Sequence, residues 1–435
     1  MTATATPTTA PSLQELAPQI TPKVKDGDLA TAQLGMLVVG VALLAGAYFT
    51  TDHFMLSYLV GYMGVLGICL CALFFTMIQH ITRAGWSVTV RRLAENIAGT
   101  IPVMFLLFIP ILIDVFGHHG IYGHWTDAEI TDTASPNFDA VIAGKSGFLN
   151  PTFFAVRAVI YFVIWSALAL YFRGRSIKQD ETGDAKISLR MSQVAAPGLL
   201  LFALSITFAA FDWIMSIDPH WFSTIFGVTY FAGGYMAFLA FTILLCRWLG
   251  SRGYLKEAIT TEHYHDLGKF LWAFMVFWTY TNFSQYMLIY YANLPEETLW
   301  FAHRAEHGWG AIGVILIVGH FLFPFAFGLS RHVKRNGVAL AFFSIFLLVI
   351  HCIDMQFLIL PGDHGGEPHV SNLTAESTFG EHFGEYLHQI SWADFGCFAG
   401  LILVIAGLTI LNIRKTNLVP TRDPRLSESL NFQNF

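Results

Sequence analysis

Charged residues are scarce in this sequence. Only 12% of the 435 residues are Asp, Glu, Lys or Arg, whereas 54% are hydrophobic. A soluble domain carries about 25% charged residues, so most of the surface of this chain is not expected to meet water. The net charge of −6 at pH 7 also argues against nucleic acid as a partner, which a basic excess would favour. The composition therefore predicts an integral membrane protein in contact with membrane lipid.

The sequence also lacks the motifs of most cofactor sites. Its five cysteines lie in apolar segments without a Cys-x-x-Cys pair, so iron–sulfur, zinc and disulfide sites are not expected. No Walker or Rossmann glycine motif is present. A cleaved signal peptide has a basic start followed by an apolar run, and the first 30 residues lack this pattern. We therefore expect no cofactor that is bound covalently or through a metal ligand.

Long apolar runs dominate the rest of the chain. A helix that crosses a bilayer needs about 20 apolar residues, and ten segments approach or exceed this length. They cover residues 33–50, 54–80, 97–116, 152–172, 194–211, 222–246, 270–292, 309–330, 337–359 and 394–413. The predicted fold class is an all-α integral membrane protein with ten transmembrane helices.

The basic residues give these helices a direction. Nearly all of the 24 Lys and Arg residues fall in the two tails and in every second loop, and such segments stay in the cytoplasm. This pattern places both termini on the cytoplasmic side, with an extended polar tail at 1–32, a transmembrane domain at 33–413 and a second tail at 414–435. Two long outer loops, 117–150 and 360–392, are expected to cover the outer face or to contact a partner.

The order of the helices suggests an internal arrangement. Helices two to five and helices six to nine each begin on the outer side and alternate alike, which favours two four-helix bundles with two peripheral helices. Five tryptophans fall at predicted outer helix ends, where indole rings favour the interface, and are expected to be interfacial anchors. They are Trp125, Trp213, Trp221, Trp300 and Trp309.

Few ionisable residues lie inside the predicted spans. Each costs at least ~2.5–3.5 kcal/mol at mid-bilayer, so each is a candidate for function. The candidates for a proton relay or a quinone-adjacent site are Asp114, Arg157, His320, His351 and Asp354. They lie at the centre or in the outer half, whereas only His80 and Glu95 mark the cytoplasmic boundary. This distribution favours chemistry near the outer face over a proton pump that crosses the membrane.

His351 and Asp354 share a helix face because they are three residues apart. A carboxylate beside an imidazole keeps both groups titratable, as a proton relay requires, but the two residues could equally form a structural pair.

Arg157 is expected to be the counter-charge of Asp114 or Asp354. His320 lies one turn before Pro324 and is expected to hydrogen-bond a backbone carbonyl that loses its helical partner at the proline. The alternative is that His320 and His351 face each other with one low-spin haem between them. A di-haem cytochrome is excluded because it needs four such histidines.

The helix at 270–292 is unusually polar, and its Asn282 and Gln285 are candidates to line a wet cavity. Lipid does not tolerate such a run, so this helix is expected to be central, with interhelical hydrogen bonds as the alternative explanation. The connection from Asp212 to Trp221 is expected to be a solvated turn at the outer interface.

Two connecting segments resemble a known family. Residues 211–227 read FDWIMSIDPHWFSTIFG, and residues 283–297 read FSQYMLIYYANLPEE. Both resemble the ActF subunit of bacterial alternative complex III, a quinol:cytochrome c oxidoreductase, and the likeness extends from the first predicted helix to the tenth. It implies the architecture of NrfD-like membrane proteins, with paired four-helix bundles.

The resemblance also implies a function and partners. It implies a cofactor-free subunit of a respiratory or photosynthetic quinol:electron-acceptor oxidoreductase in the bacterial cytoplasmic (inner) membrane, not catalytic alone. The implied partners are a sister NrfD-like quinol-binding subunit, an iron–sulfur protein, multihaem and monohaem cytochrome c subunits and, where present, a terminal oxidase. The implied ligands are menaquinone or another quinone, and lipid. A secondary transporter and a mono-haem b-type cytochrome remain open as alternatives.

Overall fold

The computed structural model describes residues 13–21, 27–117, 120–305, 308–361 and 378–434. Within these ranges the secondary structure is entirely helical. The residues of the tails and outer loops at 1–12, 22–26, 118–119, 306–307, 362–377 and 435 lie outside the described part. The predicted all-α membrane fold class is confirmed.

Nine helices in the described ranges are long and apolar enough to cross a membrane. Two of these spans are interrupted, one between α4 and α5 and the other by the π-helical segment η3. The spans are α2 (Gly27–Thr50), α3 (Phe54–Ile81), α4 (Val88–Ala98) with α5 (Ile101–Gly117), α8 (Pro151–Thr182), α9 (Ala185–Trp213), α10 (Phe226–Ser251), α13 (Trp309–Leu316) with η3 (Ile317–Leu322) and α14 (Phe323–Leu329), α16 (Gly337–Ile359) and α18 (Trp392–Ile413).

Shorter elements connect these spans or cap their ends. They are α1 (Leu13–Ile20), α6 (Gly123–Thr126), η1 (Ala128–Ile130), α7 (Ala140–Lys145), η2 (Met215–Ile217), α12 (Pro295–Ala305), α15 (Arg331–Arg335), α17 (Phe379–Gln389) and α19 (Leu426–Leu430).

The predicted tenth span corresponds to α11 (Thr261–Ala292), which is 32 residues long but is not among the nine apolar helices. The Leu418 amide donates to the Ile20 carbonyl at 2.8 Å, so the chain enters and leaves the bundle at the same end. That arrangement favours an even number of crossings, which α11 completes. The count of ten and the cytoplasmic termini stay predictions.

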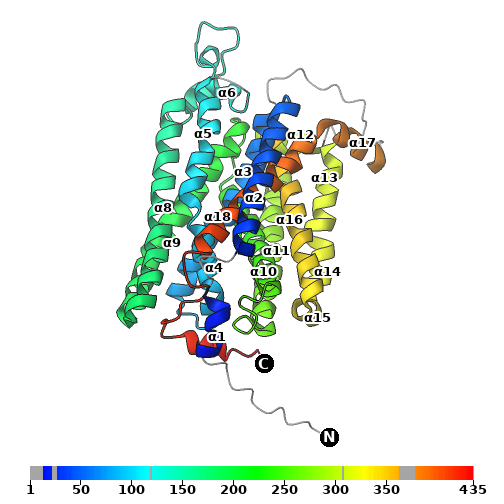
Figure 1. The fold of residues 1–435 in the computed structure, drawn as a ribbon. Helices are drawn as coiled ribbons and strands as arrows, with labels where there is room; N and C mark the ends of the chain where they lie inside the picture. Colours follow the sequence, from blue (N-terminus) through cyan, green and yellow to red (C-terminus); the bar gives the residue numbers. More distant parts are fainter. Residues whose placement is uncertain (1–12, 22–26, 118–119, 306–307, 362–377, 435) are drawn as a thin grey trace.

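The spans pack into two adjacent groups; Figure 1 shows α8 and α9 at one side of the molecule and α13 and α14 at the other. In the first bundle, α3, α4–α5, α8 and α9 pack on one another. In the second, α10 packs with α11 and α16, and α13–α14 pack on α11 and α16. α2 packs mainly on α18, and α18 packs on α3, so these two helices are peripheral. This is the arrangement that the helix order suggested.

Glycines allow the closest helix contacts. Gly67 on α3 faces Gly234 on α10, where a Cβ on Gly67 would lie 3.2 Å from the Gly234 Cα. Gly40 on α2 faces Gly400 on α18, where a Cβ on Gly40 would lie 2.7 Å from the Gly400 carbonyl oxygen. Small residues let membrane helices approach backbone to backbone, so these pairs join the two bundles and attach α2.

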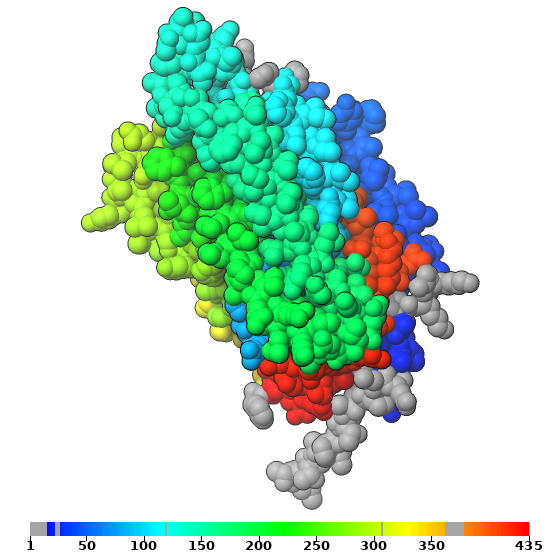
Figure 2. All heavy atoms as spheres, turned by 90° about the vertical axis from the view of Figure 1, so that its left-hand side faces the viewer, coloured from blue at the N-terminus to red at the C-terminus, as the bar shows by residue number. Residues whose placement is uncertain are grey.

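One long face of the molecule consists of α8 and α9, and Figure 2 views it directly. Large apolar side chains are exposed along both helices, which is expected of a surface that meets lipid rather than water. They include Val156, Val159, Ile160, Val163 and Leu170 on α8, and Leu200, Leu201, Leu204 and Phe208 on α9.

Two expectations about the tails and the tryptophans are wrong. Residues 13–20 of the N-terminal tail form a helix, and α2 begins at Gly27, six residues before the predicted span. The five predicted interfacial tryptophans are all at most 5% exposed. They pack inside the protein, as in the stacking of Trp221 on Trp300 with centroids 4.5 Å apart, because the outer connections fold over the helix ends.

The C-terminal tail is fastened to the bundle through a buried hydrogen-bond centre at Ser429. Its Oγ donates to the Trp86 carbonyl at 2.6 Å, accepts from the Thr89 amide and lies 3.2 Å from His263 Nε2. The Thr260 amide donates to His263 Nδ1 at 3.1 Å. The imidazole therefore serves here in its neutral form, and burial lowers the pKa of His263 to about 4.

Acidification is expected to loosen this tail. Because the folded pKa of His263 lies below its ordinary value of 6.5, the unfolded chain binds the proton more readily, and stability falls as the pH drops from 6.5 towards 4. We expect a loss of about 2 kcal/mol between pH 6.5 and pH 5, seen as faster amide exchange or proteolysis of residues 414–434. His263→Gln should remove the pH dependence, and His332→Gln, an exposed histidine at the same end, should retain it. Equal protection at pH 7 and pH 5 in the unmodified protein would contradict the prediction.

Candidate functional site

Three of the predicted ionisable residues come together inside the second bundle. His320 on η3 and His351 on α16 are fully buried, and Asp354 is 3% exposed. The two imidazoles are close enough to interact electrostatically. Trp278 on α11 joins the group: its Nε1 donates to Asp354 Oδ2 at 3.1 Å, and its ring centroid lies 3.5 Å from that of His320. We call these four residues the core cluster.

The local backbone explains why the core cluster forms. His351 and Asp354 are one turn apart on α16, and Gly233 on α10 leaves room for both. A Cβ on Gly233 would lie 3.5 Å from Asp354 Oδ2, 3.5 Å from His351 Cε1 and 3.3 Å from Trp278 Cδ1. His320 lies in a π-helical turn, a geometry that is frequent at functional sites.

The two histidines have unusual surroundings. Among the described residues, no ring nitrogen of His320 or His351 has a hydrogen-bond partner. The Gly64 backbone lies close to the His351 ring, and the backbone of His320 lies close to its own ring. The expected bond from His320 to a carbonyl freed by Pro324 is not found among the described residues. An unsatisfied buried polar group costs about 1–3 kcal/mol, so these four nitrogens are available to a proton, a water molecule or a ligand.

The polar run of α11 has a different explanation from the one expected. Thr281 Oγ1 and Asn282 Nδ2 both donate to the Trp278 carbonyl of their own helix, at 2.9 and 3.0 Å. Tyr280 and Tyr290 are 64% and 71% exposed, so α11 lies at the edge of the bundle and is not central. Only its inner face, with Trp278 and the buried Gln285, points towards other helices.

Arg157 belongs to a second, separate site in the first bundle. Its Nε and Nη2 each donate to a carboxylate oxygen of Asp212 at 2.8 Å, and Nη1 donates to the Phe148 carbonyl at 2.8 Å. Tyr161 donates to the same carboxylate at 2.8 Å. The expectation that Arg157 pairs with Asp114 or Asp354 is wrong. So is the solvated-turn interpretation of Asp212, which is fully buried.

Asp114 lies apart from both sites. It is at the outer end of α5, is 7% exposed, and accepts from the Ile121 amide at 3.3 Å. It lies near Tyr122, whose hydroxyl donates to the Trp213 carbonyl at 2.8 Å. Asp114 therefore helps to fasten the outer loop over the first bundle.

The structure also contains a buried ionic network at the end of the bundle where the C-terminal tail packs. Arg91 on α4 contacts Glu95 at 3.2 Å and Asp423 of the C-terminal tail at 2.5 Å. Arg92 contacts Glu95 at 3.0 Å and Asp180 at 2.8 Å. Both arginines were predicted to lie in the loop between the spans 54–80 and 97–116, because α4 is short and its Lys/Arg content is typical of a cytoplasmic loop. The spacings at i+3 and i+4 to Glu95 are the signal that could have revealed them.

A buried arginine in the connection between α11 and α13 was not among the residues predicted from the sequence. Arg304 on α12 is buried, lies over the Trp300 ring at 3.6 Å, and donates to the carbonyls of Phe357 and Leu358, each at 2.9 Å. Burial lowers the pKa of Arg304 to about 9. This side chain caps the last turn of α16 close to Asp354, and so supports the core cluster from outside.

No protein-family model matches the chain, and no curated protein matches it. The fold and the placement of the buried groups define a helical, multi-pass membrane protein.

The bidentate pair of Arg157 and Asp212 is expected to be structural. Asp212→Asn would leave the Arg157 charge buried without its counter-ion, which costs about 3–5 kcal/mol. Thermal unfolding in detergent should show the loss, and Glu181→Gln, at an exposed carboxylate, should leave the midpoint unchanged. If Asp212→Asn unfolds at the same temperature as the parent protein, the pair is not needed for stability.

Proposed function

We propose that this chain is a cofactor-free membrane subunit of a quinol:electron-acceptor oxidoreductase of the alternative complex III type. Its place is the bacterial cytoplasmic membrane, and its partners are those that the ActF resemblance implies. Within the complex it provides a scaffold and a proton-transfer or quinone-adjacent site. The observation that carries the proposal is the core cluster, in which two imidazoles without a hydrogen-bond partner among the described residues lie with a carboxylate inside one bundle.

The positions of the two signature segments support this proposal. Residues 211–227 contain the end of α9, η2 and the start of α10, and they supply Asp212 to the Arg157 pair. Residues 283–297 contain the end of α11 and the start of α12. The segments are linked by the stacking of Trp221 in the first on Trp300 just after the second. The two segments therefore meet at one end of the molecule, and we propose that partners on the outer face bind at this end.

The chemistry of the core cluster suits proton transfer. Asp354 and the two histidines belong to the residue types that most often act as proton donors and acceptors in enzymes. Trp278 donates to Asp354 and covers His320, so it fixes both side chains without taking part in proton transfer. A quinol that is oxidised nearby must release two protons, and the cluster offers acceptors for them.

The direction of proton movement follows from what lies beyond the cluster. At the inner end of the second bundle, Arg335 is already paired with Glu262. The ionic network of Arg91, Arg92 and Glu95 closes the inner end of the neighbouring first bundle. Paired guanidinium groups stay protonated and therefore do not exchange protons readily. We therefore assign proton release to the outer side and no passage through the cytoplasmic end.

Substitution of the core cluster in the assembled complex tests this role. Asp354→Asn and His351→Gln should lower quinol oxidation or proton release by about a hundredfold, the lower end of what a positioned acid or base contributes. Trp278→Phe should give a smaller decrease, since only the donor to Asp354 is lost. Trp272→Phe on the same helix, whose Nε1 donates to the Phe325 carbonyl, is the matched control. Unchanged rates in Asp354→Asn and His351→Gln would eliminate the relay.

The place of the chain in a complex has its own test. Purification through an affinity tag in mild detergent is expected to recover multihaem cytochromes and an iron–sulfur protein with this subunit. A cofactor-free subunit needs such partners to carry the electrons of quinol oxidation. An isolated, stable chain without those partners would contradict the proposed complex.

A mono-haem b-type cytochrome is the second candidate. The observation that favours it is the pair of buried imidazoles at His320 and His351, whose ring nitrogens have no hydrogen-bond partner within the described part of the chain. A reduced-minus-oxidised spectrum of the purified chain separates the candidates, since a b-type signal lost in both His320→Gln and His351→Gln would replace the cofactor-free proposal. A secondary transporter has less support, because the prolines of the spans do not form a matched pair of broken helices.

A further inference from the structure

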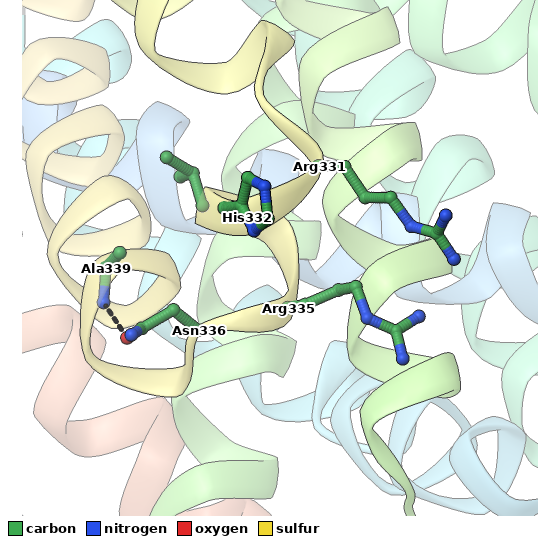
Figure 3. A pocket seen from close by; sticks show the side chains of 6 residues that line it. Arg331, His332, Arg335, Asn336 and Ala339 are labelled. Carbon is green, nitrogen blue, oxygen red and sulfur yellow. Dashed lines mark hydrogen bonds between the residues drawn. The ribbon is translucent and has the colours of Figure 1, made fainter. Parts of the chain in front are cut away.

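A basic pocket opens at the cytoplasmic end of the second bundle, away from the core cluster. It has a volume of about 680 Å³ and lies between α15 and the start of α16. It is lined by Arg331, His332, Val333, Arg335, Asn336 and Ala339. Figure 3 shows the Arg331 and Arg335 side chains extending to the same side, as expected for residues four apart on a helix.

The charge of this pocket is only partly neutralised. Arg335 forms a bidentate bond with Glu262, at 2.5 and 2.7 Å. Arg331 is exposed and, among the described residues, forms no ion pair. Arg247 on α10 adds a further guanidinium, which lies against Gly337 beside the pocket. Lys334 donates to the carbonyls of Gly328 and Leu329.

An apolar track leads away from the pocket along α16. Val338, Phe342, Ile345 and Val349 follow at helical spacing and are 76%, 51%, 54% and 48% exposed. Leu329, at the end of α14 next to the pocket, is 59% exposed. The pocket therefore lies where two predicted spans end, with cations on the cytoplasmic side and an exposed apolar stripe on the membrane side.

We infer that this pocket binds the headgroup of an anionic phospholipid whose acyl chains lie along the exposed stripe of α16. Arg331 and Arg335 provide donors for the phosphate, since a guanidinium matches phosphate oxygens in geometry and charge. Basic pockets between membrane helices on the cytoplasmic side suit such headgroups. A soluble anion would use the cations but would gain nothing from Val338 and Phe342.

Lipid binding to the purified full-length chain tests the assignment. Native mass spectrometry in mild detergent compares phosphatidylglycerol with phosphatidylcholine of the same acyl chains. Phosphatidylglycerol should bind more tightly, and Arg331→Gln should weaken it about fivefold, as expected for one charge near the membrane surface. Arg190→Gln, at an exposed arginine of α9 at the same end of the bundle, should bind as the parent does.

Inorganic phosphate distinguishes a lipid from a free anion. Phosphate at the lipid concentration should not displace phosphatidylglycerol, and Phe342→Ala should weaken the lipid without changing phosphate binding. Displacement by phosphate, equal binding of the two lipids, or equal losses in Arg331→Gln and Arg190→Gln would each overturn the assignment. Far-ultraviolet circular dichroism of each variant confirms that the helices remain folded.

Discussion

Polar side chains inside a membrane protein have no bulk water to bond, and this constraint organises the whole chain. Each buried charge needs a partner from another segment, so ion pairs tie distant parts of the sequence together. Arg157 holds α8 to the end of α9 through Asp212. Arg91 holds α4 to the C-terminal tail through Asp423. These bonds close the two ends of the molecule.

The core cluster differs from those pairs in a way that bears on function. Asp212 receives three side-chain hydrogen bonds from Arg157 and Tyr161, so its charge is compensated and its role is structural. Asp354 receives one, from neutral Trp278, and the histidines beside it have none among the described residues. A fully bonded pair stabilises the fold, whereas an under-bonded group can change its protonation state. The proposed proton chemistry therefore lies in the second bundle.

Several parts of this arrangement were predictable from the sequence, and the failures have common causes. The candidates His320, His351 and Asp354 were found by their position inside apolar spans, and the structure does bring them together. The partner of Arg157 was not found, because Asp212 lies at the end of a span and looks like part of a solvated turn. Trp278 was hidden in a polar run in which most neighbours bond to their own helix.

Hydrophobicity, helix length and the distribution of Lys and Arg are properties of each segment by itself. The sequence therefore determined the membrane class, the approximate spans and their predicted direction. The contacts between helices were decided by tertiary packing alone, since a side chain's partner depends on rotation and depth, and neither leaves a local signal. The close approach of Gly67 to Gly234 and the position of Gly233 set those rotations. They place Trp278, His351 and Asp354 against one another rather than towards lipid.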